Sequence, residues 1–281
     1  MIETGEGVEF PLGTRAALDP SRPCLSCEFC RAGRSNLCLD MRFLGSAARF
    51  PHVQGGFAQH LVLRQDQIVP VPDDTDLLRL SVAEPLSVAL HAVTRAGLLT
   101  GKRVLVSGSG PIGLLTARAA RFAGAIEVVS TDIADAPLAV ALSRMGASHA
   151  VNVATDPNGL APFETAGGYF DVVFEASGAP AALGALMRVI RRGGRIVQIG
   201  MMPAGTTALA LNVLQSRELE LLGAFRAHDE FRLAVRLIVT GAIDVSPILS
   251  GTYPLAQAAS ALQTAGDRSR VIKLHLALEQ A

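Results

Sequence analysis

The stretch "RVLVSGSGPIGLLTARAARFAGAIEVVSTD", residues 103–132, decides the fold. A continuous apolar run (103–108) leads through a glycine-rich turn into an alanine-rich amphipathic segment (111–125), and a second apolar run (127–132) follows. Short apolar runs bounded by glycine predict buried strands. The proline that opens the amphipathic segment favours a helix there, because its missing N–H has no partner in a first turn anyway. The stretch therefore predicts a strand, a helix and a strand, as in a parallel sheet.

The same alternation continues beyond this stretch. It predicts further helices at 137–147 and 181–194, and further strands at 170–178, 195–200 and 219–225. Continuous apolar strands separated by amphipathic helices are typical of a parallel sheet covered on both faces. The fold class expected is therefore α/β, with a Rossmann doubly wound parallel sheet.

The two ends of the chain differ from its middle in composition and in hydrophobic pattern. The first 80 or so residues contain every cysteine, many prolines and short alternating stretches, which predicts a β-rich, loop-rich region. After residue 244 come a turn-rich stretch, a predicted helix near 254–265 and a last predicted strand in "RVIKLHL". We expect three segments, at 1–84, 85–244 and 245–281, with the parallel sheet in the middle one.

Bulk composition restricts the function. The 281 residues are 49% hydrophobic, and Lys+Arg and Asp+Glu both total 25, which predicts a sizeable core and argues against a nucleic-acid partner. No apolar run reaches the roughly 18 residues of a membrane span, and the first ten residues lack the basic and apolar parts of a signal peptide. We therefore expect a cytoplasmic protein with reduced thiols and no membrane partner.

The glycine-rich turn has the spacing of a dinucleotide site. Gly108, Gly110 and Gly113 follow the pattern G-x-G-x-x-G, and Pro111 opens the helix. After a strand and before a helix, the first glycine allows a tight turn, the second lets a pyrophosphate approach, and the third lets helix and strand pack closely. The helix N-terminus offers unpaired N–H groups to the phosphates. The spacing alone is weak evidence, since the chain has 27 glycines, and an ordinary glycine turn is the alternative.

Asp132 ends the next predicted strand, where such folds place an acidic residue. Its carboxylate can accept hydrogen bonds from both ribose hydroxyls and would repel a 2′-phosphate, and residues 133–136 contain no arginine to bind one. The sequence thus favours NAD, with NADP possible. The alternative is a surface carboxylate at a strand end.

All four cysteines lie in "PCLSCEFCRAGRSNLC", residues 23–38. Cys24, Cys27, Cys30 and Cys38 are spaced so that one loop can place successive thiolates on one zinc ion. A full set of four sulfur ligands leaves no open position for substrate or water, so the predicted zinc is structural. Free buried thiols are the alternative.

Several stretches resemble the zinc-containing medium-chain alcohol dehydrogenases, and their polyol branch in particular. They are "AEPLSVALHA" (83–92), "GSGPIG" (108–113), "MRFLGSAARFPHVQGGF" (41–57) and "GAFRAHDEF" (223–231). The resemblance implies a truncated β-rich, GroES-like catalytic domain in 1–84, with 245–281 returning to it. It also implies a homodimer or homotetramer and NAD(P)-linked oxidation of a secondary alcohol in a polyol or sugar acid, with L-idonate, giving 5-keto-D-gluconate, as the favoured substrate.

The resemblance also implies roles for individual residues. Glu84 matches a glutamate that faces the catalytic zinc, and Arg226 matches an arginine that contacts substrate hydroxyls and could meet a carboxylate. Ala227 stands where sorbitol dehydrogenases have tyrosine. The positions that match the cofactor's surroundings are Ile112, Ile199, Gly200, Met201, Ala224 and Phe225. The alternatives are that Glu84 caps a helix, that Arg226 pairs with Asp229 or Glu230, and that the apolar residues are core.

In this family a second zinc binds the alcohol oxygen, and its ligands include a cysteine and a His-Glu pair upstream of the structural loop. Every cysteine here lies in the loop, and "GHE" does not occur. The resemblance therefore implies that these ligands belong to a segment before Met1, as a misassigned start codon would produce. Two alternatives stay open: a non-catalytic NAD-binding remnant, and a sorbitol or threonine dehydrogenase of the same family.

The histidines lack partners at ligand spacing, and we expect them to be structural. His91 is predicted to lie in the core, whereas His52 and His228 are candidates to line a substrate cleft.

Overall fold

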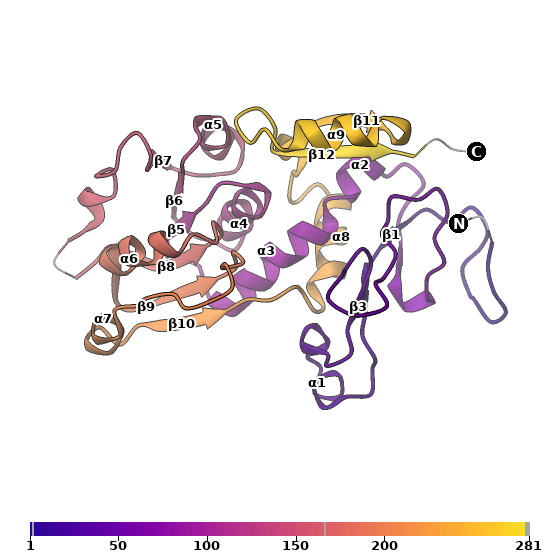
Figure 1. Cartoon of the computed structure of the whole chain (residues 1–281), viewed down its shortest axis with the longest axis horizontal. Helices are drawn as coiled ribbons and strands as arrows, with labels where there is room; N and C mark the ends of the chain where they lie inside the picture. The colour runs from indigo at the N-terminus through magenta and orange to yellow at the C-terminus, as the bar shows by residue number, and fades with distance from the viewer. Residues whose placement is uncertain (2, 166, 279–281) are drawn as a thin grey trace.

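The structure is a computed structural model that describes residues 1, 3–165 and 167–278. Its largest part is built on a six-stranded sheet in which all strands are parallel (Figure 1). The strand order is β10-β9-β8-β5-β6-β7, so the chain winds outward from β5 in both directions. The strands are β5 (Arg103–Ser107), β6 (Glu127–Asp132), β7 (His149–Asn152), β8 (Phe170–Glu175), β9 (Ile190–Gln198) and β10 (Glu220–Gly223). This is the doubly wound order, which places a crevice where the winding reverses, between β5 and β8. The predicted Rossmann sheet is confirmed.

Helices cover both faces of the sheet because side chains alternate along each strand. In β5, Val104 and Val106 pack with α3 (Ala83–Ala96) and α4 (Pro111–Phe122), whereas Leu105 packs on the other face with α6 (Pro180–Val189). The remaining elements of this region are α5 (Asp135–Arg144), η3 (Ala161–Phe163), α7 (Leu211–Ser216) and α8 (Glu230–Val239).

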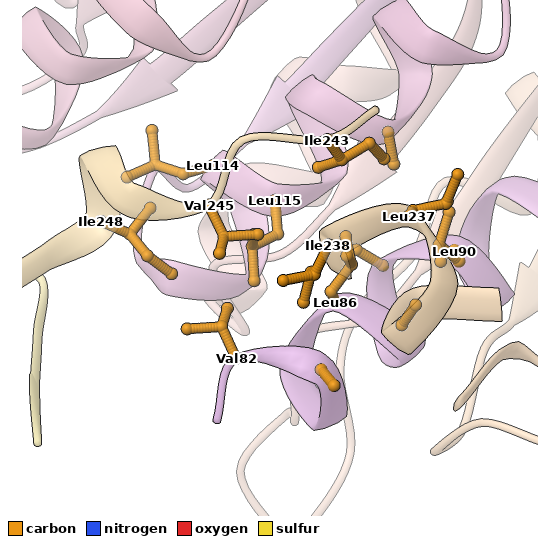
Figure 2. Close-up of a cluster of buried hydrophobic side chains, with 14 of the residues drawn as sticks. Val82, Leu86, Leu90, Leu114, Leu115, Leu237, Ile238, Ile243, Val245 and Ile248 are labelled. Carbon is orange, nitrogen blue, oxygen red and sulfur yellow. The ribbon is translucent and has the colours of Figure 1, made fainter. Parts of the chain in front are cut away.

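A buried hydrophobic cluster joins α3, α4 and α8 (Figure 2). It contains Val82, Leu86, Leu90, Leu114, Leu115, Leu237, Ile238, Ile243, Val245 and Ile248. Phe231, in the first turn of α8, belongs to the same cluster. Because a close-packed core tolerates little displacement, this turn is held firmly against α3. The position of the segment just before α8 depends on this packing.

The N-terminal region is built from very short strands and loops. β1 (Ala16–Leu18) pairs antiparallel with β4 (Ile68–Pro70), and β2 (Ser21–Arg22) pairs antiparallel with β3 (Arg42–Phe43). Between and after them lie α1 (Glu28–Arg31), η1 (Ser35–Leu37), η2 (Gln65–Gln67) and α2 (Leu77–Leu80). The region is thus as rich in loops as predicted, and its strands are shorter than the alternating stretches suggest.

The C-terminal part forms a small unit beside α2 (Figure 1). β11 (Leu249–Pro254) pairs parallel with β12 (Lys273–Ala277), and α9 (Ala258–Ala265) connects them. Two 3₁₀ turns complete it, η4 (Ser246–Ile248) and η5 (Leu255–Gln257). The hydroxyl of Ser81 lies 2.7 Å from Nε2 of His275, which ties this unit to the end of α2. In the described part of the chain, no helix has the length and apolar character that crossing a membrane requires.

One predicted boundary is wrong by several residues. The helix expected at 181–194 ends at Val189, and β9 begins at once with Ile190 instead of at 195. Gly193 takes a φ of 65°, which a helix cannot continue, and Phe170 pairs with Ile190 across the sheet. Pairing with β8 therefore outweighs the helical pattern of the arginine-rich end.

Candidate active site

The glycine-rich turn joins β5 to α4 at the carboxyl edge of the sheet. Gly108 has a φ of 92°, and a Cβ there would lie 2.7 Å from the backbone nitrogen of Ser177. A Cβ on Gly113 would overlap the carbonyl oxygen of Gly108. Around Gly110, by contrast, a Cβ would meet nothing within 4 Å. Two glycines are thus needed for packing, and the third faces open space at the first turn of α4, as a dinucleotide site requires.

Asp132 is fixed beside this turn. One carboxylate oxygen accepts from the backbone N–H of Ser109 at 2.6 Å, and the other accepts from Ile133 at 2.8 Å and Ala134 at 3.0 Å. A carboxylate has about four acceptor positions, so one is left for a hydroxyl. Asp132 is therefore tied into the turn, with one acceptor position left where the sequence predicts hydrogen bonds from both ribose hydroxyls.

The other positions predicted to surround the cofactor follow β9 and β10, whose carboxyl ends lie at the same edge. Ile199 and Ala224 pack against the core, and Ile112 is half-buried on α4. Met201 is 87% exposed and Phe225 is 50% exposed. A Cβ on Gly200 would collide with the backbone of Gly178, so two strand-end loops meet there.

Glu175 organises these loops and was missed from the sequence. Its side chain is fully buried at the end of β8. It accepts hydrogen bonds from the backbone of Ser177 at 2.9 Å and of Gly178 at 3.1 Å, from the side-chain amide of Gln198 at 2.6 Å, and from the Ser177 hydroxyl. A carboxylate directly after the apolar run "VVF" (172–174) was the signal that could have revealed it.

The four cysteines come together in the N-terminal region. Their sulfur atoms all lie within 4.8 Å of one another, with Cys27 and Cys30 at 3.5 Å and Cys24 and Cys30 at 4.0 Å. Tetrahedral zinc with Zn–S bonds of about 2.3 Å requires sulfur–sulfur separations near 3.8 Å, so the arrangement fits zinc. Hydrogen bonds from Ser26 lower the pKa of the Cys24 thiol to about 6, whereas burial raises that of Cys30 to about 12.

The consequence of this donor set is structural. Four thiolates complete a tetrahedral zinc and leave it no position for substrate. Over the described ranges, no second group of metal-ligating side chains is found. This loop, residues 23–38, is called the zinc loop below. A zinc ion held there would brace the scaffold and could not also bind a substrate.

A small pocket brings the two predicted catalytic residues together. It is lined by Asp19, Ser21, Phe43, Glu84, Ser87, Arg226, Ala227, His228 and Phe231. Burial raises the pKa of Glu84, and the charge of Lys273, another residue missed from the sequence, opposes that shift. Burial in turn lowers the pKa of Lys273. Of the two histidines considered for a cleft, His228 lines this pocket and His52 is not among its lining residues.

Arg226 does not make the ion pair that was its structural alternative. Its guanidinium lies 4.7 Å from the ring centre of Phe225 and 5.5 Å from that of Phe43. Within the described ranges it forms no ion pair. Burial lowers its pKa, which reflects the cost of holding this charge partly out of water. The pocket is therefore lined by a cation that has no ion-pair partner among the described residues.

Glu230, one of the acidic partners considered for Arg226, instead pairs with His91. Glu230 Oε1 lies 3.1 Å from His91 Nδ1, and Oε2 accepts from the backbone N–H of His228 at 3.0 Å. Both side chains are buried, as predicted for His91. Burial alone would raise the pKa of Glu230, but these hydrogen bonds outweigh it and lower the pKa to about 2.

We expect Glu230→Gln to destabilise the protein by about 2 kcal/mol at pH 7, the usual worth of hydrogen bonds to a buried charge. Because the folded-state pKa lies below the ordinary 4.5, this contribution is present above pH 4.5 and is lost as the pH falls toward 2. Urea unfolding of the wild type and of Glu230→Gln between pH 7 and pH 3 measures the difference in their free energies of unfolding. Glu28→Gln, at an exposed position of α1, is the control. If Glu230→Gln lost as much stability at pH 3 as at pH 7, the lowered pKa of Glu230 would be contradicted.

The sequence is similar to known families and to proteins of known function. Residues 1–73 match the family model of the alcohol dehydrogenase GroES-like domain, and residues 111–240 match that of the zinc-binding dehydrogenases. Over 269 residues the chain is 40% identical to the L-idonate 5-dehydrogenase (NAD(P)(+)) of Escherichia coli strain K12, covering 95% of this chain and 77% of that protein. It is 31% identical over 259 residues to a sorbitol dehydrogenase of Bacillus subtilis, covering 92% and 72%.

Solved structures agree. The crystal structure of the Escherichia coli L-idonate 5-dehydrogenase superimposes with a TM-score of 0.92 at 38% identity, covering 97% of this chain and 78% of that one. A zinc-binding dehydrogenase of Sinorhizobium meliloti 1021 bound to NADP gives 0.83 at 31% identity, covering 93% and 76%. The GroES-like N-terminal region, the glycine turn of the parallel sheet and the four-cysteine cluster therefore share one explanation: the chain belongs to the zinc-binding, NAD(P)-dependent alcohol dehydrogenase family, among relatives that act on CH–OH groups.

Proposed function

We propose that this chain takes part in the reversible oxidation of L-idonate to 5-keto-D-gluconate with NAD. In this reaction the C5–H bond breaks and its hydride reduces the nicotinamide, the hydroxyl proton leaves, and the C–O bond becomes a carbonyl. The observation that carries the proposal is the unpaired guanidinium of Arg226 in the pocket that also contains Glu84. The 40% identity to a named L-idonate 5-dehydrogenase supports the same substrate.

The charge of Arg226 favours a sugar acid over a neutral polyol. The guanidinium lies near two aromatic rings and is already partly desolvated, so binding an anion removes less water from it. A carboxylate is the planar anion that matches its hydrogen-bond donors. Arg49 adds a second positive charge nearby, which further lowers the pKa of Arg226. A neutral polyol would leave the charge of Arg226 without an ion-pair partner, whereas Arg49 already pairs with Asp40.

Cofactor binding is assigned to the carboxyl edge of the sheet. Gly108, Gly110, Pro111, Ile112 and Gly113 would hold the diphosphate. Asp132 would hold the adenosine ribose, and its charge favours NAD over NADP. Ile199, Gly200, Met201, Ala224 and Phe225 would contact the nicotinamide half, and the exposure of Met201 and Phe225 leaves apolar surface for it to cover.

Within this proposal Glu84 supplies a carboxylate with a raised pKa at the wall of the pocket. The family's second zinc would polarise the alcohol oxygen there, but the described residues provide no ligand set for it, and no proton-transfer step is assigned. A homodimer or homotetramer is proposed on family resemblance, and it is supported by β10, which forms the outer edge of the sheet.

Replacing Arg226 with glutamine should weaken the binding of L-idonate by about 30- to 100-fold, because a hydrogen-bonded charge pair contributes about 2 to 3 kcal/mol. Sorbitol, which has the same carbon number and no charge, should change less than about threefold. Calorimetric titration in the presence of NADH measures both, and initial rates on the same variants give KM and kcat.

Arg49→Gln is the matched control, since Arg49 already pairs with Asp40 at 3.4 Å. It should lower the affinity for L-idonate far less than Arg226→Gln. Equal losses for L-idonate and sorbitol in Arg226→Gln would show that the arginine recognises hydroxyls, and the substrate would then be reassigned to a polyol. Wild-type protein that binds NADH but neither sugar would favour the non-catalytic alternative.

A further inference from the structure

Residues 225–229 connect β10 to α8 and carry Arg226 in an unfavourable backbone conformation. Arg226 has a φ of 57°, in the left-handed region that long side chains seldom occupy. Such a conformation costs about 1 kcal/mol or more and persists only where neighbouring groups impose it. The residues that impose it therefore also determine where the guanidinium points.

The zinc loop supports this segment from one side. The side-chain amide of Asn36 donates to the carbonyl oxygen of Phe225 at 3.1 Å, and the hydroxyl of Ser35 lies 2.8 Å from Nδ1 of His228. Asn36 is a polar residue that is only 7% exposed, so its amide would be costly to bury without this partner. The two contacts lie on either side of Arg226.

The core supports the same segment from the other side. The backbone N–H of His228 donates to Glu230, which pairs with His91 on α3. Because α3 and α8 share the cluster of Figure 2, this side is rigid. The position of Arg226 therefore depends on whether the zinc loop holds its own side equally well.

Ser35 and Asn36 lie in η1, between the third and fourth cysteines. The backbone N–H of Cys38 donates to the carbonyl oxygen of Ser35 at 3.0 Å, so η1 ends directly on a ligand of the sulfur cluster. Closing the cluster around one ion would fix η1 and, through it, the segment that carries Arg226.

We propose that Ser35 and Asn36 are positioning residues that hold Arg226 toward the pocket, so that the zinc loop sets the affinity for the anionic end of the substrate. The part that concerns affinity rests on the function proposed above. The part that concerns the conformation of residues 225–229 does not, and it can be tested without any substrate.

The first test is trypsin cleavage after Arg226, followed by mass spectrometry of the full chain. A backbone held from both sides resists proteolysis, and losing one buried hydrogen bond should raise the open population about tenfold. Asn36→Ala and Ser35→Ala should therefore be cleaved there about tenfold faster than wild type. Cleavage after Arg268, in an exposed turn far along the chain, is the internal reference and should not change.

Two further variants make this test selective. Ser35→Thr keeps the hydroxyl and should restore the slow cleavage, whereas Glu28→Gln alters an exposed side chain of the same loop and should behave as wild type. Unchanged cleavage after Arg226, or equal acceleration after Arg226 and Arg268, would overturn the proposal. So would the loss of zinc from Asn36→Ala and Ser35→Ala, because these residues would then act by maintaining the loop.

The second test is affinity. Asn36→Ala should bind L-idonate about tenfold more weakly while keeping wild-type affinity for ADP-ribose, which reports on the glycine turn and Asp132. Unchanged affinity for L-idonate would overturn the part of the proposal that concerns substrate. If wild-type protein binds no L-idonate, the proposed function fails, and the proteolysis result still decides whether Ser35 and Asn36 position Arg226.

Discussion

Replacing Gly113 with alanine is expected to abolish NADH binding, with a loss of at least 100-fold in affinity, and to lower stability. The added methyl group would overlap the carbonyl oxygen of Gly108, which is backbone and cannot move without displacing the whole turn. Overpacking of this kind costs about 1 to 3 kcal/mol, and the displaced turn would no longer present its N–H groups to the phosphates. Fluorescence titration with NADH and thermal unfolding measure the two effects.

Substitutions at two other glycines distinguish a loss of NADH binding caused by misfolding of the turn from one caused by a blocked diphosphate site. A methyl group on Gly110 meets nothing within 4 Å and its φ is −63°, so Gly110→Ala should fold normally but bind NADH poorly, since the methyl enters the space of the diphosphate. Gly184→Ala, on an exposed turn of α6 with open space around it, should match wild type in NADH binding. Wild-type affinity in Gly110→Ala would mean that the diphosphate lies elsewhere.

Replacing Cys38 with serine is expected to reduce bound zinc from about one per chain to well below one, because a hydroxyl does not replace a thiolate ligand of zinc. Structural zinc contributes directly to folding, so the variant should lose several kcal/mol and unfold about 10 °C lower. Metal analysis by mass spectrometry and thermal unfolding measure both. Affinity for ADP-ribose, which lacks the nicotinamide, should be retained, because the glycine turn between β5 and α4 lies away from the loop that carries α1 (Figure 1).

Glu28→Gln, in the same loop, should keep its zinc and serves as the control for substitutions there. Full zinc content in Cys38→Ser would contradict the four-sulfur assignment. A simultaneous loss of ADP-ribose binding would show instead that the loop and the sheet unfold together.

The features that the sequence predicted well depend on neighbours in the chain. Gly108 and Gly113 meet through a turn of a few residues, and Cys24 and Cys38 meet through a single loop, so spacing was enough to predict both groups. Likewise β6 occupies the predicted residues 127–132. In each case the interacting groups are too close in sequence for the rest of the fold to separate them.

The features that the sequence did not predict depend on distant partners. Glu230 meets His91 and Asn36 meets Phe225 only because α8 packs on α3 and the zinc loop reaches the segment after β10. No local pattern marks either pair, so Glu230 looked like a partner for Arg226 and Asn36 looked like an ordinary loop residue. The early start of β9 has the same origin, since its first residue pairs with Phe170.

The tethering of Asp132 matters for anyone who wishes to re-engineer this protein for the phosphorylated cofactor. Exchanging the carboxylate for a small neutral side chain would remove the repulsion, but it would also leave the amides of Ser109, Ile133 and Ala134 without their shared acceptor. A gain in tolerance for the extra phosphate would thus be accompanied by a less rigid glycine turn. A successful redesign must supply replacement acceptors for those amides before it adds any basic residue.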